Sequence, residues 1–282
     1  MKLIADCGST KIHWCLLARD KVVREFFTTG INAVMLTGDE IYARLADELA
    51  PQLLADDDIR SIYFYGAGCI SPEVCGNVAE ALKRVIPSAD EIDVNTDLLA
   101  AARALCGHEP GIACIMGTGS NSCYYDGTQI VQNVSPLGFI LGDEGSGAVL
   151  GKLFMGDVLK NQLPADLTEK FLTEYGLDRL TVIRRVYKEP GANRFLASVV
   201  PFLSANIDQP QIHRLVVNAF GEFFKRNIAQ YPDWQSRPVH FIGSVAYYFR
   251  SVLEQAATRV GCTVGTVIQS PMPGLIEYHK AN

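Results

Sequence analysis

Two short glycine-rich turns, each lying between apolar strand-like segments, constrain the fold more than any other feature of the sequence. The first, Asp6-Cys-Gly-Ser-Thr-Lys11, and the second, Gly117-Thr-Gly-Ser-Asn121, open two stretches of similar pattern. Glycine lets the backbone approach a phosphate group closely, and consecutive N–H groups form a nest for an anion. If a pseudo-twofold axis relates the two stretches, the turns face each other and could clamp the phosphates of a nucleotide.

The order of predicted strands and helices repeats along the chain. Apolar and β-branched segments predict strands at 3–6, 12–17, 22–28, 61–66 and 91–94, and again at 112–117, 122–126, 128–131 and 239–243. The first three strands of each half follow one another closely, which is typical of an antiparallel meander, and Asp126-Gly127 is a strong hairpin turn. We therefore expect an α/β fold made of two similar halves.

Helical periodicity fills most of the remaining sequence. It predicts helices at 41–53, 73–85, 98–105, 146–160, 166–175, 179–187, 212–231, 246–260 and 274–280. A Gly-His-Glu-Pro-Gly segment at 107–111 is a candidate hinge. The expected domains are residues 1–108 and 109–282, with a last helix, near 274–281, that could pack back on the first domain.

Composition narrows the class of protein. Hydrophobic residues make up 48% and charged residues 20% of the 282 positions, as in ordinary globular proteins. No apolar run approaches the ~18 residues of a membrane helix, and Asp6 interrupts the opening Lys2-Leu-Ile-Ala5 before a signal-peptide core could form. A cytoplasmic protein without a membrane partner is expected. The net charge of −6, without a basic stretch, argues against a nucleic-acid partner.

Several common sites are disfavoured by spacing. The eight cysteines form no C-x-x-C pair and most lie in apolar runs, so buried thiols are the favoured interpretation over a metal site or disulfides. The five histidines show no H-x-x-x-H spacing, which argues against a zinc enzyme. The stretch Gly147–Leu153 has three spacers where a P-loop has four and lacks its final Ser or Thr, and no G-x-G-x-x-G occurs.

The sequence resembles the superfamily of sugar kinases, heat-shock chaperone ATPases and actin. Within it, the sequence is similar to the N-acetylglucosamine kinase group, which shares a family with the activator ATPases of benzoyl-CoA reductases. The matching stretches, in the family's order, are Asp6–Lys11, Gly30-Ile-Asn32, Asn95-Thr-Asp97, Gly117–Asn121, Leu141-Gly-Asp-Glu-Gly-Ser-Gly147 and Phe241-Ile-Gly-Ser-Val245. The resemblance implies two ribonuclease H-like (actin-like ATPase) domains with a nucleotide and sugar cleft between them.

The resemblance also assigns the nucleotide site. It implies that Asp6 serves a magnesium ion and that Thr10 and Lys11 serve the β- and γ-phosphates of ATP. Thr118, together with the backbone of Gly117 and Gly119, would bind the nucleotide phosphates. Gly243 and Ser244 would line the adenosine pocket.

The sugar site follows from the same resemblance. The residues that would hold the sugar are Asn32, Ser120, Asn121 and Asp143, and Asp97 matches the catalytic aspartate of the family. Chemistry favours the last assignment as well, because a carboxylate must accept the proton of the attacked hydroxyl and Asp97 follows a predicted strand at the sheet edge where ligands bind.

Both acids have a simpler structural interpretation. Asp is a preferred N-cap, and Asp97 directly precedes the helical segment 98–105, so a capping role is open and can coexist with catalysis. Asp143-Glu144 likewise precedes a helix, and capping would explain one of the two acids. The flanking glycines favour close approach to a ligand, and we expect Asp143 to accept a hydrogen bond from a sugar hydroxyl.

One stretch departs from the family pattern. The amino-sugar kinases carry Gly-Gly-Trp-Gly before their L-G-D-E-G motif, whereas this chain has Ser135-Pro-Leu-Gly138. A tryptophan provides a firm aromatic wall, and Leu137 provides apolar contact alone. Kinase activity is compatible with the change, and it is the identity of the sugar that the change affects.

Three functions are compared. The first is phosphorylation of an amino-sugar hydroxyl, foremost the 6-hydroxyl of N-acetylglucosamine, with ATP and magnesium, by a protein whose default oligomer is a homodimer. The second is an activator-type ATPase with an iron–sulfur cluster bridging a dimer, which requires suitably placed cysteines; Cys106, Cys114 and Cys123 lack cluster-like spacing. The third is a non-catalytic regulator that binds nucleotide or sugar.

Overall fold

The computed structural model describes residues 1–8 and 10–280. The chain divides into two compact units. Unit 1 contains residues 1–108 together with the segment that begins at Pro271, and unit 2 contains Glu109–Ser270. The change from one unit to the other between His108 and Glu109 lies inside the glycine- and proline-containing segment 107–111.

Unit 1 is built on a five-stranded sheet with the order β3-β2-β1-β4-β5. The strands are β1 (Lys2–Cys7), β2 (Lys11–Ala18), β3 (Lys21–Thr29), β4 (Ser61–Gly66) and β5 (Glu91–Thr96). The first three are antiparallel, and β4 and β5 run parallel to β1. The predicted meander and the two following strands are confirmed.

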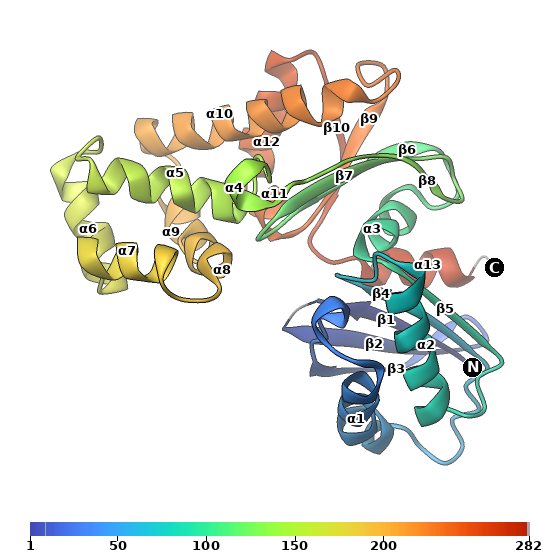
Figure 1. The fold of residues 1–282 in the computed structure, drawn as a ribbon. Coiled ribbons are helices and arrows are strands. Elements are labelled where there is room, and N and C mark those ends of the chain that lie inside the picture. The colour runs from blue at the N-terminus through green and yellow to red at the C-terminus, as the bar shows by residue number, and fades with distance from the viewer. Residues whose placement is uncertain (9, 281–282) are drawn as a thin grey trace. The chain divides into compact units, whose positions relative to one another are not determined.

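Helices cover both faces of this sheet (Figure 1). They are η1 (Ala33–Met35), α1 (Gly38–Glu48), η2 (Ala50–Gln52), α2 (Pro72–Val85), α3 (Asp97–Cys106) and α13 (Met272–Lys280). One face packs against α1 and α2 through residues such as Leu3, Trp14 and Leu45. The other packs against α3 and α13 through Ile4 and Leu275, so the last described helix completes the first unit.

Unit 2 contains a second five-stranded sheet with the order β10-β9-β6-β7-β8. Its strands are β6 (Gly111–Met116), β7 (Ser120–Tyr125), β8 (Ile130–Val134), β9 (Pro238–Ile242) and β10 (Thr263–Ile268). Numbered by position within each unit, both sheets have the order third, second, first, fourth, fifth, with antiparallel pairing among the first three strands. The expected α/β fold with two similar halves is confirmed.

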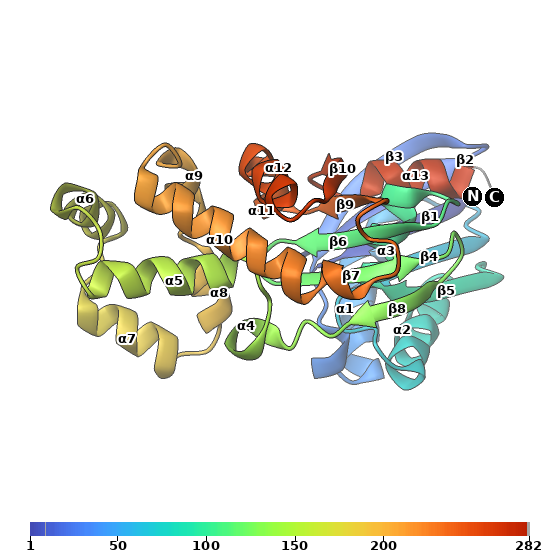
Figure 2. The same ribbon diagram turned by 90° about the horizontal axis from the view of Figure 1, so that it is seen from above.

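Unit 2 also contains a long helical insertion between β8 and β9. Its helices are α4 (Gly138–Leu141), α5 (Gly147–Leu159), α6 (Ala165–Tyr175), α7 (Arg179–Tyr187), α8 (Ala192–Ala197), α9 (Val200–Ala205), α10 (Pro210–Arg226) and η3 (Ile228–Gln230), and α11 (Ser244–Tyr248) and α12 (Arg250–Arg259) follow β9. Helix α5 packs against α8 and α10, and α10 packs against α12 (Figure 2).

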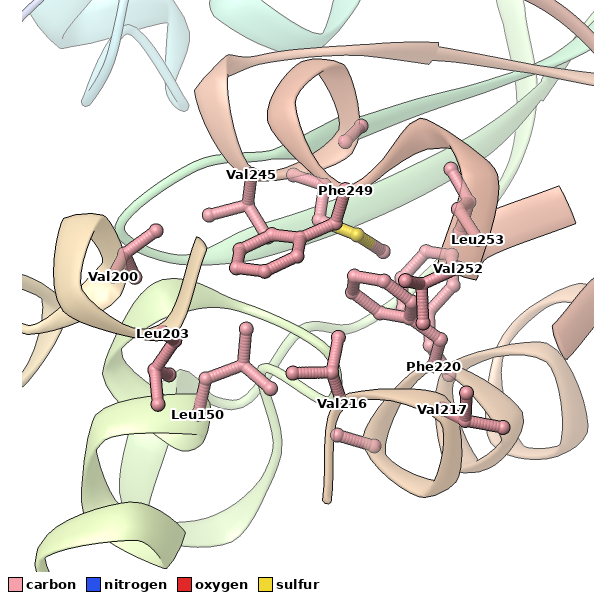
Figure 3. Packing of buried hydrophobic residues seen from close by; sticks show 14 of the residues in the cluster. Leu150, Val200, Leu203, Val216, Val217, Phe220, Val245, Phe249, Val252 and Leu253 are labelled. Atoms are coloured by element: carbon pink, nitrogen blue, oxygen red, sulfur yellow. The ribbon is translucent and has the colours of Figure 1, made fainter. Parts of the chain in front are cut away.

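The core of unit 2 joins these helices to the sheet. Phe249 projects from the end of α11 toward Leu150 of α5, Leu203 of α9 and Val216 of α10 (Figure 3). The apolar stripe of α10 is buried here, with Phe220 and Phe223 fully inaccessible. This packing fixes α11, whose first residue is the candidate site residue Ser244, and α5, whose first residues hold the second glycine-rich turn.

Some elements were missed or displaced in the prediction. Helices α4, α8 and α9 and strand β10 were not expected, and the third strand of unit 2 is Ile130–Val134 and not 128–131. The hairpin turn has the expected chemistry, because the Asp126 carboxylate accepts hydrogen bonds from the N–H groups of Thr128 and Gln129, both at 2.8 Å. Among the described helices, none has the length and apolarity needed to cross a membrane.

Candidate active site

Two carboxylates gather at one edge of the sheet in unit 1. Asp6 lies near the end of β1, and Asp97 is the first residue of α3, directly after β5. Asp6 is in register with Tyr65 of β4, which is in register with Asn95 of β5. Because in-register residues of parallel strands share a face, the Asp6 row leads directly to the start of α3.

Both carboxylates are buried, and the pKa of each is raised. Burial, and next the charge of Asp97, raise the pKa of Asp6 to about 6, while the Lys11 ammonium opposes the rise. Burial also raises the pKa of Asp97, while the backbone N–H groups of Leu98 and of Asp97 itself lower it. A second negative charge is unfavourable here without a cation, so the pair suits a bound positive ion.

Asn95 is a residue of this row whose role the sequence did not suggest. Its Nδ2 is buried and, among the described residues, has no hydrogen-bond partner. A buried amide donor without a partner is costly, and an oxygen of a bound ligand would satisfy it. The sequence feature that could have indicated Asn95 is a polar residue near the end of a predicted strand, two positions before Asp97.

The capping interpretation of Asp97 is wrong. Thr96 is the N-cap of α3, and its Oγ1 accepts a hydrogen bond from the N–H of Leu99 at 3.2 Å. Asp97 is one residue further along, in the first turn, where the helix dipole favours a negative charge. Its side chain is therefore not needed to cap the helix.

The other predicted residues of unit 1 lie in the first glycine-rich turn or beside the turn after β4. The turn closes with a hydrogen bond from the N–H of Gly8 to the carbonyl of Lys11 at 3.0 Å, and Thr10 and Lys11 are both exposed. Asn32 is exposed and lies beside the turn after β4, since its Oδ1 would be 3.0 Å from a Cβ added to Gly68. Unit 1 thus carries the predicted metal, phosphate and catalytic residues and one of the sugar residues.

The second glycine-rich turn, in unit 2, is fixed on the start of α5. The N–H of Gly117 donates to the carbonyl of Gly119 at 2.9 Å. The N–H groups of Gly147 and Ala148 donate to the carbonyls of Gly117 and Thr118, at 2.8 and 3.0 Å. The Thr118 side chain remains exposed, and a Cβ added to Gly117 would meet no atom within 4 Å. Space for a ligand is therefore present beside the turn.

Asp143 lies directly against this turn. Its Oδ1 accepts a hydrogen bond from the N–H of Ser120 at 3.4 Å, and its Oδ2 would be 3.2 Å from a Cβ added to Gly119. The backbone adopts a left-handed conformation, with φ +53°, that Asp tolerates better than most residues. Burial raises the pKa of Asp143, the Ser120 N–H lowers it, Glu144 raises it and Lys152 lowers it.

Capping by Asp143 or Glu144 is also ruled out. Ser146 is the N-cap of α5, and its Oγ accepts from the N–H of Val149 at 3.2 Å. Glu144 has a different task, because its Oε1 pairs with Arg226 Nε at 2.9 Å and its Oε2 accepts from Asn227 Nδ2 at 3.2 Å. The two adjacent acids therefore differ: Glu144 is held by α10 and its end, and Asp143 faces the turn.

Ser120 and Asn121, the other predicted sugar ligands of unit 2, have internal partners. Ser120 Oγ donates to the carbonyl of Glu144 at 2.8 Å. Asn121 Oδ1 accepts from the N–H of Ser122 and from Asn133 Nδ2, both at 2.9 Å. Asp143, by contrast, accepts a single long hydrogen bond among the described residues. Of the three, Asp143 has the side chain with the most capacity for a ligand.

Gly243 makes close contact between β9 and the same turn. Its φ is +122°, and a Cβ there would lie 2.4 Å from the carbonyl oxygen of Met116, far inside contact distance. Glycine is thus required, and it brings the exposed Ser244, the first residue of α11, next to Gly117. Unit 2 therefore brings together the predicted residues around Gly117–Asn121, Asp143 and Gly243-Ser244.

Asp6 is the residue predicted to serve a magnesium ion. Within residues 1–8 and 10–280, no group of three or more His, Cys, Asp or Glu side chains could hold a metal ion. The neighbouring carboxylates of Asp6 and Asp97 suit magnesium, which commonly uses one or two protein carboxylates together with water and substrate phosphates. The cysteines considered for an iron–sulfur cluster lie within regular elements, with Cys114 and Cys123 buried in β6 and β7.

Comparison with known proteins gives matches among solved structures. No family model and no curated protein matches the chain. A candidate N-acetylglucosamine kinase from Porphyromonas gingivalis is 50% identical, with 100% of this chain and 99% of that chain covered and a TM-score of 0.95. A candidate N-acetylglucosamine kinase from Chromobacterium violaceum is 20% identical over 98% of both chains, with a TM-score of 0.73.

A more distant structure shares the fold as well. The ROK family glucokinase from Streptomyces griseus, solved with glucose and AMPPNP, is 13% identical over 98% of this chain and 97% of that one, with a TM-score of 0.54. The repeated sheet order and the two glycine-rich turns define a two-domain protein of the actin-like ATPase fold. The chain belongs to the N-acetylglucosamine kinase group of the sugar kinase, heat-shock chaperone and actin superfamily.

Proposed function

We propose that this protein is a sugar kinase that transfers the γ-phosphoryl group of ATP to a hydroxyl of an amino sugar, foremost the 6-hydroxyl of N-acetylglucosamine. The observation that carries the proposal is the Asp97 carboxylate, which stands beside Asp6 at the sheet edge without serving as a helix cap. The 50% identity to the Porphyromonas candidate N-acetylglucosamine kinase over the whole chain supports the choice of sugar.

Asp97 would act as the general base. In the proposed reaction the hydroxyl oxygen of the sugar bonds to the γ-phosphorus, the bond from that phosphorus to the β,γ-bridging oxygen breaks, and the hydroxyl proton moves to Asp97. ADP is the leaving group. A raised pKa makes the Asp97 carboxylate a stronger proton acceptor, provided that it is ionised at the working pH.

The phosphate chains would be held by both glycine-rich turns. Lys11 and Thr10 would donate to the β- and γ-phosphates, and Thr118 and the N–H groups of its turn would contact the nucleotide phosphates. Asp6 would hold magnesium through its water shell. When bound, magnesium neutralises charge on the phosphate oxygens. Among the described residues Asn95 Nδ2 has no partner, and it could donate a hydrogen bond to an oxygen of the phosphates or of the magnesium-bound water.

Asp143 would orient the sugar. Its carboxylate can accept a hydrogen bond from a sugar hydroxyl, and its left-handed backbone fixes the direction of the side chain. We propose that Asn32 contributes from unit 1, and that Ser120 and Asn121 contribute through the groups that their internal hydrogen bonds leave over. Gly243 and Ser244 would line the adenosine pocket. Holding the hydroxyl near the phosphorus is the main way to accelerate a phosphoryl transfer with a loose transition state.

A sugar panel tests the proposal. ADP release is measured with ATP and magnesium, with N-acetylglucosamine, glucosamine, N-acetylmuramic acid, N-acetylmannosamine or glucose as acceptor and with no sugar as the control. We expect release that depends on an amino sugar and a product whose mass is that of the sugar phosphate. Equal release with and without sugar, or nucleotide and sugar binding without product, would overturn the kinase assignment.

A further inference from the structure

Four side chains on strands β2 and β3 of unit 1 form a line of contacts, on the face of the sheet that carries Asp6. They are Glu25, His13, Phe27 and Lys11. Asp6 of β1 is in register with His13 of β2, and His13 is in register with Phe27 of β3. In-register residues of an antiparallel pair share a face, so Phe27 and His13 lie on the face that carries Asp6. Lys11 is two residues before His13 on the same strand and shares that face.

The contacts in this line are direct. Glu25 Oε2 lies 2.7 Å from His13 Nε2, which fixes the imidazole ring. The Phe27 ring stacks on that imidazole, with ring centroids 4.4 Å apart and an interplanar angle of 22°. Lys11 Nζ lies over the Phe27 ring, 5.0 Å from its centroid. A phenylalanine that is 55% exposed thus contacts both a fixed imidazole and an ammonium group.

We propose that Phe27, braced by His13 and Glu25, is a positioning residue that holds the Lys11 ammonium in place for the phosphates of the nucleotide. This inference rests on the proposed function, because it assigns a support to one of its phosphate-binding residues. The lysine side chain has four flexible methylene groups and loses much rotamer entropy when it binds. An aromatic face that attracts the ammonium reduces that loss.

The contact with Phe27 also gives the Lys11 ammonium a partner that does not neutralise its charge, unlike its acidic neighbours. Lys11 and Asp6 interact electrostatically, since the ammonium lowers the pKa of Asp6. Nevertheless, within the described part of the chain, Lys11 forms no ion pair with a carboxylate. Contact with Phe27 offers attraction without neutralising the ammonium, so Lys11 keeps its charge for a phosphate and Asp6 keeps its own for a cation.

Substitutions of Phe27 test this role. Phe27→Leu keeps an apolar side chain and removes the aromatic face, and Phe27→Trp keeps the face that attracts cations most strongly. The affinity for AMPPNP and for ADP is measured by calorimetry without sugar, and the KM values for ATP and sugar are measured separately. Because a cation–π contact at an exposed site is worth about 0.5–1 kcal/mol, Phe27→Leu is expected to weaken AMPPNP binding about two- to fivefold.

Matched variants separate this role from a structural one. Val23→Ala, at another exposed position of β3, is expected to bind AMPPNP like the wild type, and Phe27→Trp to bind at least as tightly. The sugar KM of Phe27→Leu should not change. Equal AMPPNP affinities for Phe27→Leu and Val23→Ala, or a parallel rise in both KM values of Phe27→Leu, would overturn the inference.

A Lys11 variant distinguishes failure of the inference from failure of the proposed function. Lys11→Met should weaken AMPPNP binding more than Phe27→Leu, and the double variant should be no weaker than Lys11→Met, because Phe27 acts through Lys11. A double variant weaker than Lys11→Met, or a Lys11→Met protein with wild-type affinity, contradicts the inference. The kinase proposal itself fails on a different result, namely ADP release that does not depend on sugar.

Discussion

The two glycine-rich turns occupy corresponding places in two sheets of the same strand order, yet they offer a ligand different chemistry. The turn of unit 1 is surrounded by charged side chains, with Asp6 and Lys11 beside it and Asp97 across two strands. The turn of unit 2 is formed by glycine backbone fixed on the first residues of α5, with Asp143 as the carboxylate beside it.

The difference shows that two domains with the same strand order can offer a ligand different kinds of contact. In unit 1, the strand ends direct side chains that can bind a cation, hold a phosphate and accept a proton. In unit 2, open space lies beside the backbone of Gly117, and we propose that the shape of the turn and its N–H groups provide the recognition there. Substitution of the charged side chains of unit 1 should therefore change catalysis or charge. Substitution of the glycines of unit 2 should instead distort the backbone.

The largest expected effect is on catalysis in unit 1. Asp97→Asn should lower kcat by about 10²–10⁴-fold, because general-base catalysis contributes that much, while AMPPNP and sugar binding persist. The matched control is Asp90→Asn, an exposed aspartate directly before β5, at the opposite end of the strand, which should leave kcat within about twofold. A folded Asp97→Asn enzyme with wild-type kcat would remove the chemical role assigned to unit 1.

The next effect is on stability in unit 2. Gly243→Ala places a Cβ 2.4 Å from the Met116 carbonyl oxygen at a φ of +122°, so backbone must move, and we expect a loss of about 3 kcal/mol in the free energy of unfolding. Urea denaturation measures it. Gly221→Ala in α10, where a Cβ would meet no atom within 4 Å, should instead be neutral or add about 0.5–1 kcal/mol. Similar stabilities for the two variants would contradict the geometric account.

Substitution of Asp6 is expected to stabilise the protein, because removal of its buried charge should raise the free energy of unfolding at neutral pH. The pKa of Asp6 is about 6 in the folded protein and near 4 when unfolded, so between these values the folded state binds more protons. Stability from this group is present below pH 4 and is lost as pH rises toward 6. Asp6→Asn should remove that loss and raise the free energy of unfolding at pH 7 by about 2 kcal/mol.

The measurement for Asp6 is urea denaturation of wild type and Asp6→Asn across pH 4 to 7, without nucleotide or magnesium. The difference between the two proteins should grow as pH rises through this range. Asp90→Asn serves as the matched substitution, because it removes an exposed carboxylate and not a buried one. A difference independent of pH would mean that the charge of Asp6 is not the cause.

A smaller effect than these is expected on sugar affinity in unit 2. Asp143→Asn retains a residue that tolerates φ +53° and removes the negative charge, so the sugar KM should rise about tenfold while the ATP KM stays the same. The protein should remain folded, because Ser146 and not Asp143 caps α5. A larger change in the ATP KM than in the sugar KM would place Asp143 on the nucleotide side.

The parts of the fold that could be predicted are those with a local signal. The meander strands, the buried strand Ser61–Gly66 and helix α7 show clear apolar patterns and appear at or near the predicted positions. Strand β10 has a weak pattern and contains Gly265, which is needed because a Cβ there would lie 2.7 Å from the His240 ring. Such a requirement depends on the neighbouring strand and leaves no local signal.

The candidate site shows the same limit. Glycine-rich turns are visible in sequence, but the capping roles of Thr96 and Ser146 depend on where each helix begins, which periodicity locates to within a few residues. The stack of Phe27 on His13 depends on strand register, and the unpaired Asn95 amide depends on burial. Contacts between strands are long-range in sequence, so a local pattern cannot specify them.

The return of α13 to unit 1 has a consequence for biosynthesis. A ribosome makes β1 to α3 first, then all of unit 2, and α13 only after that. Unit 2 is contiguous and can finish folding during translation, whereas Ile4, Cys15, Leu17 and Tyr65 wait for Leu275 and Ile276 to cover them. The first unit to emerge is thus the last to be completed, and until α13 is made, part of the apolar face of its sheet lacks the helix that covers it.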